Sequence, residues 1–140
     1  MRIARVFSPV AICSSLVISL SGCALVATVS PDVDSQLFPD TSALHTAAPV
    51  AYPTPRFVPS DATMIRIDYD TRSGAAIMTY TSEKHTTAGA CTGEVHTPTP
   101  PLQDTWWPVT GIPQTSSACA GGWSVFTIGN QVFASTTGES

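Results

Sequence analysis

The sequence predicts a small all-β domain, an antiparallel sandwich or open barrel with one disulfide, which follows a signal peptide and an extended tether. Three observations support this fold class. After Pro59, short runs rich in β-favouring residues alternate between apolar and polar positions. Turn residues separate these runs. No window of about 11 to 18 residues keeps the apolar stripe of an amphipathic helix, which favours an all-β architecture.

Residues 1–22 follow the order of a secretory signal. Two arginines supply positive charge near the start, and a short apolar segment covers residues 10–20. The segment ends in a tetrapeptide, Leu20-Ser21-Gly22-Cys23. This motif resembles the lipobox of bacterial lipoproteins, in which leucine, a small residue, and glycine or alanine precede a cysteine.

The resemblance implies that a diacylglycerol is attached to the Cys23 thiol, that cleavage occurs before Cys23, and that further acylation, for example by palmitate, follows. The mature protein would then be anchored to the cell membrane on its extracytoplasmic face. Two or three acyl chains make release from a bilayer slow, whereas one chain binds only weakly. The alternatives are an ordinary cleaved signal with a coincidental cysteine, or an uncleaved anchor helix.

Residues 23–60 are predicted to be the lipidated N-terminus and a tether rich in proline, serine and threonine. Each proline restricts itself and the residue before it to extended geometry, so long helices are excluded. Fully extended at about 3.1 Å per residue, the tether would span on the order of 100 Å. Several apolar residues argue against a purely solvated linker, and docking of a few of them on the domain is the alternative: Leu37, Phe38, Leu44, Tyr52 and Phe57.

Residues 61–140 are predicted to form the β domain, beginning with a hairpin. Its strands cover residues 63–69 and 75–81, joined by a short polar loop that ends at Gly74. A second, tight hairpin is predicted at Gly129 and Asn130, because both residues tolerate positive φ. Its strands and two further ones are expected at residues 123–128, 131–135, 90–96 and 105–110.

Cys91 and Cys119 are predicted to form a disulfide. They are a pair in a small, exported chain, where oxidising conditions favour disulfides. A domain of this size has a marginal core, so a covalent link would contribute much of its stability. A metal pair and a reactive thiol are the alternatives, although no CxxC spacing is present.

The mature chain is acidic. Without the leader, four basic side chains (Arg56, Arg66, Arg72 and Lys84) stand against ten acidic ones, for a net charge of 4 − 10 = −6. Such a surface repels phosphate backbones, so nucleic acid is excluded as an expected partner. The expected partners are the membrane, through the lipid on Cys23, and an unknown envelope protein or extracellular ligand.

No stretch indicates a metal, a cofactor or a catalytic group. The segment from Asp68 to Gly74 begins like a calcium loop, but Arg72 occupies its fifth position and Thr79 stands where a glutamate is needed. Two histidines near Cys91 lack a clear third ligand. Pairs of carboxylates for glycoside cleavage would have to be assembled by the fold, from Glu83, Glu94, Asp104 and Asp68.

Trp106 and Trp107 are the candidate surface for a ligand or partner. Adjacent indoles in a strand point to opposite faces, so both cannot enter one core. An exposed indole would contribute strongly to binding a sugar, a peptide or a protein. The structural alternative is that the surrounding proline-rich loop folds back over the outer indole.

The order of a lipid anchor, a spacer and a small β domain loosely resembles actinobacterial lipoproteins of unknown function, on residues around Pro108 and from Cys119 to Trp123. This resemblance implies no activity. We therefore expect a non-catalytic envelope lipoprotein that acts as a binding or interaction module. The alternatives are a small envelope hydrolase acting on cell-wall or glycan substrates, and a phage-exclusion or inhibitor lipoprotein.

Overall fold

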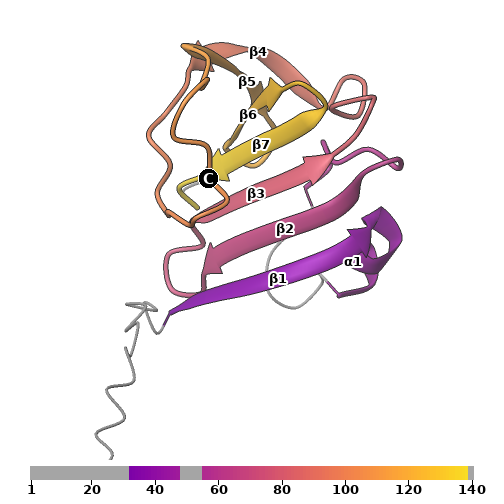
Figure 1. Cartoon of the computed structure of the whole chain (residues 1–140). Helices are drawn as coiled ribbons and strands as arrows, with labels where there is room; N and C mark the ends of the chain where they lie inside the picture. The colour runs from indigo at the N-terminus through magenta and orange to yellow at the C-terminus, as the bar shows by residue number, and fades with distance from the viewer. Residues whose placement is uncertain (1–31, 48–54, 139–140) are drawn as a thin grey trace, which may run out of the picture.

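A computed structural model describes residues 32–47 and 55–138 of the chain. The predicted signal peptide, the lipobox and Cys23 lie outside these residues. Within them the chain forms one open antiparallel sheet of seven strands and one short helix (Figure 1). The elements in chain order are β1 (Val33–Asp40), α1 (Thr41–Ala47), β2 (Thr63–Asp70), β3 (Ala76–Thr81), β4 (Cys91–His96), β5 (Thr115–Cys119), β6 (Trp123–Ile128) and β7 (Gln131–Thr136).

The strand order across the sheet is β1-β2-β3-β7-β6-β5-β4. The first three strands form a meander, and the last four form a second meander that runs back from β4 to β7. β7 then pairs with β3 and joins the two meanders into one sheet. The predicted all-β fold is confirmed as a single open sheet, whose edges are β1 and β4.

Both predicted hairpins are present. Asp70 N–H donates to the Ala75 carbonyl at 2.8 Å, and the loop turns at Gly74, whose φ is +74°. In the second hairpin, β6 and β7 pair up to Ile128 and Gln131, so only two residues form the turn. Gly129 has a φ of +64° there, a conformation that glycine adopts without steric cost.

The predicted boundary at residue 60 is wrong, because part of the expected tether belongs to the fold. β1 pairs with β2 from Val33↔Asp70 to Asp40↔Thr63. The chain then turns into α1, where an Asp40 carboxylate oxygen accepts the Ala43 N–H at 2.9 Å. Such a side-chain cap satisfies a free N–H at the helix start. The prolines of this segment did not exclude β1, since an edge strand tolerates a residue without an N–H.

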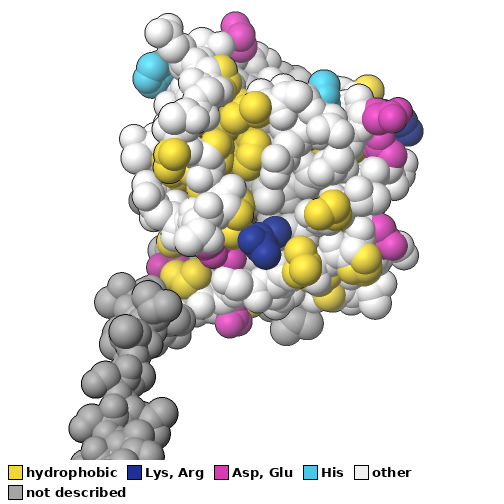
Figure 2. Space-filling view, in the orientation of Figure 1, with side chains coloured by type: hydrophobic (Ala, Val, Ile, Leu, Met, Phe, Trp, Pro, Cys, Tyr) yellow, Lys and Arg dark blue, Asp and Glu magenta, His cyan; other side chains and the backbone are white. Residues whose placement is uncertain are grey.

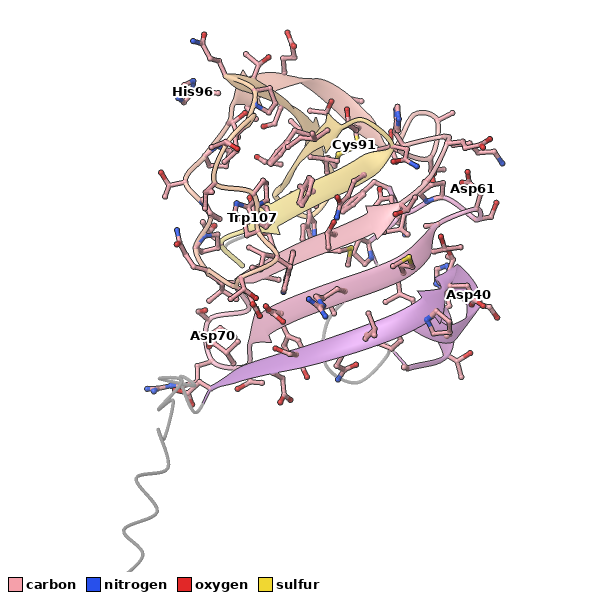
Figure 3. The ribbon with its side chains drawn as sticks, viewed as in Figure 1. Asp40, Asp61, Asp70, Cys91, His96 and Trp107 are labelled. Carbon is pink, nitrogen blue, oxygen red and sulfur yellow. A yellow bond between two sulfur atoms is a disulfide. The ribbon has the colours of Figure 1, made fainter. Side chains whose placement is uncertain are left out.

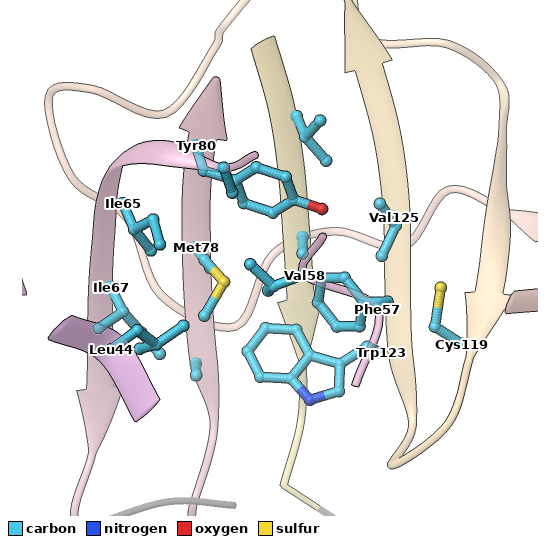
Figure 4. Packing of buried hydrophobic residues seen from close by; sticks show 14 of the residues in the cluster. Leu44, Phe57, Val58, Ile65, Ile67, Met78, Tyr80, Cys119, Trp123 and Val125 are labelled. Atoms are coloured by element: carbon cyan, nitrogen blue, oxygen red, sulfur yellow. The ribbon is translucent and has the colours of Figure 1, made fainter. Parts of the chain in front are cut away.

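The main core lies on the sheet face that α1 and residues 55–62 cover (Figure 4). Leu44 of α1 packs with apolar residues of the sheet. Phe57 packs edge-on against Trp123 of β6, with ring centroids 5.5 Å apart. Of the apolar residues noted in the expected tether, Phe38, Leu44 and Phe57 are buried and Leu37 is exposed, while Tyr52 lies outside the described residues.

The structure differs from the predicted strands at two places in the second half of the domain. Residues 105–110 form no strand and belong to a long loop, whereas the polar segment Thr115–Cys119 forms β5. The predicted disulfide is confirmed, because Cys91 and Cys119 stand opposite each other on β4 and β5 and are bonded. The disulfide therefore joins neighbouring strands near one edge of the sheet.

Candidate functional site

The loop of residues 97–114 covers part of the second face of the sheet, opposite the main core. Trp107 anchors it: only 7% of its surface is exposed, and its ring packs edge-on against Phe126 and Phe133 at centroid distances of 5.9 and 5.7 Å. Ile77 completes this second cluster. Figure 3 shows Trp107 on the loop that runs past β7. The Trp107 indole thus holds the loop and presents little surface to a ligand.

Trp106 is only half-buried. Its ring contacts that of Trp107 edge-on, at 6.0 Å between centroids. The guanidinium carbon of Arg66, on β2, lies 5.9 Å from the Trp106 ring centroid. This distance is within the range of a cation–π contact, which favours one orientation of the arginine side chain.

Two apolar side chains lie near Arg66 on the uncovered part of the sheet. Leu37 is 66% exposed and stands opposite Arg66 on the edge strand β1. Met64 is 71% exposed and precedes Arg66 by two residues on β2. Figure 2 shows hydrophobic side chains on both sides of a basic side chain on this face. We call this set the Arg66 surface: Leu37, Met64, Arg66 and Trp106.

β2 has a local irregularity at Met64. The register between β2 and β3 shifts between Thr63 and Arg66, and Met64 has a φ of 52°. A positive φ is rare for residues other than glycine, and bulges commonly redirect a side chain. Ile65 points into the core and Met64 to solvent, as the alternation of side chains along a strand requires.

Beneath Trp106, two carboxyl groups from distant parts of the sequence meet. Asp68 of β2 is 3% exposed, and the side chains of Asp104 in the loop and Ser35 on β1 lie close enough to influence its pKa. Burial raises the pKa of Asp68, and the Asp104 carboxylate raises it further. Burial also acts on Asp104, but hydrogen bonds from the Thr105 side chain and backbone outweigh it and lower the pKa of Asp104.

This pair shares a proton most readily at Asp68, because like charges in contact cannot both ionise without cost. One Asp68 oxygen, Oδ1, is buried without a hydrogen bond. The Trp106 side chain lies near both carboxyl groups, and its buried Nε1 has no hydrogen-bond partner. Asp68 on β2 and Asp104 on the loop thus bring the Trp106 segment of the loop close to β2.

The loop of residues 68–74, which begins like a calcium loop, is held by hydrogen bonds and an ion pair within the protein. In the loop that resembles a calcium site, Asp70 Oδ1 accepts the N–H groups of Arg72 and Ser73 at 2.8 and 3.1 Å. Arg72 pairs with Asp32, at 3.0 Å, instead of with an aspartate of its own loop. Within the described part of the chain, no three His, Cys, Asp or Glu side chains are grouped to hold a metal ion.

The site residues predicted from the sequence lie in three different situations. Cys23 falls outside the described residues, Cys91 and Cys119 form the disulfide, and of the two tryptophans only Trp106 presents a partly open ring. Leu37, Met64 and Arg66 were not predicted as neighbours of Trp106, because they are far from it in the sequence. One signal was available: the adjacent apolar pair of Met64 and Ile65 breaks the alternation of β2, which is typical of a bulge.

Comparison with known proteins adds no relative: no family model, no curated protein and no solved structure matches the chain. Over residues 32–47 and 55–138, no helix has the length and apolar character needed to cross a membrane.

Proposed function

We propose that this protein is a membrane-anchored envelope lipoprotein whose β domain is a non-catalytic binding module. The observation that carries the proposal is the Arg66 surface, where Arg66 lies against Trp106 and is flanked by exposed Leu37 and Met64. Tryptophan and arginine dominate the energetics of protein interfaces, and methionine and leucine add adaptable apolar contact.

The Arg66 surface is built on rigid elements, which favours binding. Leu37, Met64 and Arg66 project from hydrogen-bonded strands, and the loop that carries Trp106 is anchored by buried Trp107. Little conformational entropy is then lost on association, so more of the contact energy contributes to affinity. A partner protein that offers an acidic group to Arg66 and apolar side chains to its neighbours fits this surface.

The proposed lipid anchor places that partner close to the membrane. Nine residue steps separate Cys23 from Asp32, the first described residue. At about 3.3 to 3.6 Å per residue, they reach at most about 30 Å. This is much less than the distance expected for a tether that ends at residue 60. The Arg66 surface would therefore stay close to the membrane, where it would meet its partner.

The carboxyl pair does not favour the hydrolase alternative. Glycosidases hold their two carboxyl groups roughly 5 to 9.5 Å apart on either side of the scissile bond. Asp68 is 3% exposed, so its carboxyl is not open to a substrate, and the nearby Asp104 carboxylate raises its pKa. Their arrangement is suited to holding the loop on the sheet.

A quantitative pull-down from membranes tests the proposed function. The intact lipoprotein and two charged variants are compared: Met64→Asp in the Arg66 surface, and Val95→Asp on β4 at the opposite edge of the sheet. Both replaced side chains are exposed, so both variants are expected to fold. We expect capture of a membrane-associated partner to fall at least tenfold with Met64→Asp and to persist with Val95→Asp.

Equal capture by the two variants, or no protein enriched by the wild type, contradicts the binding proposal. The anchor is tested separately by labelling with palmitate and by membrane fractionation. Cys23→Ala is expected to abolish labelling and to release the protein from membranes. Full labelling of that variant would contradict the anchor and leave the result at the Arg66 surface intact.

A further inference from the structure

β4 forms the edge of the sheet that lies farthest from β1 (Figure 1). It pairs with β5 on one side, and every residue from Thr92 to His96 is exposed. A free strand edge presents unpaired N–H and C=O groups, which form a template for the addition of another strand. The open edge of β4 is therefore a candidate interaction surface.

The two edges of the sheet are protected differently. Natural sheets block a free edge with proline or with charged side chains. β1 carries both, as Pro39 and the exposed Asp34 and Asp40. The residues of β4 include no proline, and Val95 is 39% exposed. A bulge interrupts β4 before Glu94, so the regular part of this open edge runs from Glu94 to His96.

The direction of the backbone groups on β4 follows from its pairing with β5. Thr97 N–H donates to the Gln114 carbonyl at 2.9 Å, in line with the β4–β5 ladder. N–H and C=O groups of successive residues in a strand point to opposite sides. Val95 therefore faces β5, whereas the N–H and C=O groups of Glu94 and His96 face the open edge.

These directions restrict how a second copy of β4 can pair with the first, antiparallel and around a twofold axis. An axis at Glu94 would oppose two carboxylates, and like charges directly opposite each other destabilise a sheet. An axis at His96 would place Glu94 opposite Pro98, which has no N–H. An axis at Val95 places Glu94 of each copy opposite His96 of the other, so this register uses both residues.

The side chains of β4 are complementary to themselves in the register centred on Val95. Glu94 and His96 share one face of the strand, where an imidazole N–H of one copy can donate to the carboxylate of the other. Thr115 Oγ1 already donates to Glu94 Oε1 at 3.1 Å, which orients the carboxylate on this face. On the opposite face the two Val95 side chains meet at the axis, and apolar pairs of this kind stabilise neighbouring strands.

We propose that two copies of this chain associate edge to edge through β4, with Val95 at the twofold axis. Glu94 of each copy exchanges backbone hydrogen bonds with His96 of the other, and the two sheets become one continuous sheet. Pairing of such short strands buries little area, which is typical of a weak and reversible dimer. The inference does not rest on the lipid anchor or on the Arg66 surface.

Disulfide cross-linking tests the register. The sample is the full chain with Cys13→Ala and Cys23→Ala, in which an introduced cysteine is the one free thiol, since Cys91 and Cys119 are bonded. Residues that face each other at such an axis have Cα atoms about 4.5 Å apart, which suits a disulfide. With copper phenanthroline as oxidant, Val95→Cys is expected to form at least tenfold more covalent dimer than Val109→Cys, a 90% exposed position on the loop. Equal cross-linking of the two variants overturns the proposal.

Analytical ultracentrifugation of exposed-site variants tests the match of the side chains. His96→Glu opposes two carboxylates and is expected to weaken the dimer at least tenfold. The double variant Glu94→His with His96→Glu restores the pair with its roles exchanged, so it is expected to dimerise like the parent. The proposed register is wrong if His96→Glu has no effect, or if the double variant stays as weak as His96→Glu.

The dimer and the Arg66 surface give separate outcomes. Val95→Asp places two carboxylates at the twofold axis, so it is expected to abolish the dimer. It keeps partner capture, because each copy carries a complete Arg66 surface. Met64→Asp is expected to lose capture and keep the dimer. A dimer that Met64→Asp breaks and Val95→Asp leaves intact would place the contact at the Arg66 surface and overturn the proposal.

Discussion

Removal of the Cys91–Cys119 disulfide is expected to cost the domain a large part of its stability. The disulfide joins β5 to β4, the last strand of the sheet. No β4 side chain is buried, so β4 is held by its backbone ladder to β5 and by this covalent bond. The double variant Cys91→Ala with Cys119→Ala removes the bond and leaves the ladder.

The magnitude follows from the length of the closed loop. The two cysteines are 28 residues apart, and in the chain-entropy model a loop of about 29 residues contributes about 3.6 kcal/mol. A domain of about 100 residues has a free energy of unfolding of about 5 to 15 kcal/mol. The loss is thus about a quarter to nearly three quarters of the total, and the melting temperature is expected to fall by about 15 to 30 °C.

Urea denaturation and thermal melts of the parent and the double variant, both with Cys23→Ala, measure this loss. Hydrogen exchange adds a local readout, in which β4 amides are expected to lose protection before those of β2 and β3. A loss below about 1 kcal/mol, or uniform loss of protection across the sheet, would refute the reasoning that the disulfide compensates for the missing burial of β4.

Three further predictions concern the second face of the sheet. Trp107→Ala is expected to cost about 3 to 5 kcal/mol in urea denaturation, because the buried ring anchors the loop. Trp106→Ala should cost much less, and equal losses would contradict their different burial. Asp68→Asn is expected to stabilise the domain near neutral pH. Burial raises the folded-state pKa of Asp68, so the protonated carboxyl contributes to the stability of the folded domain at low pH, and this contribution is lost as pH rises through that pKa. The advantage of Asp68→Asn in thermal melts should shrink toward pH 4, and an advantage that grows on acidification would reverse the sign of the argument. Met64→Gly is expected to stabilise by up to about 1 kcal/mol, because glycine relieves the positive φ and little burial is lost; a melt in which Met64→Val is the more stable variant would show that this φ is not strained.

Local patterns were sufficient to predict the parts of the fold that depend on neighbouring residues. The hairpin at Gly129 and Asn130 followed from residues that tolerate positive φ, and β2 and β3 followed from alternation around a polar loop. The disulfide followed from the number of cysteines and the expected compartment. Each of these inferences uses information from within a few residues or from composition.

β1 and β5 could not be predicted in this way. β1 has one buried side chain, Phe38, so an edge strand of this kind shows no alternating pattern. β5 is mostly serine and threonine, and its place comes from its ladder with β4 and β6. Residues 105–110 showed the opposite error, because their aromatic side chains favour a strand locally but pack from a loop onto the second face of the sheet.

The sequence by itself determined the β class of the domain, two hairpins, the disulfide and the tryptophan pair as a feature to test. Only the tertiary structure decided that Trp107 is an anchor, that Trp106 lies against Arg66 from a strand 40 residues earlier, and that Asp68 meets Asp104. The short pairing of β5 with β6, which stops at Ser117↔Val125, was likewise decided by the tertiary structure. These contacts join segments far apart in the chain, and their energies depend on burial and register that no local pattern carries.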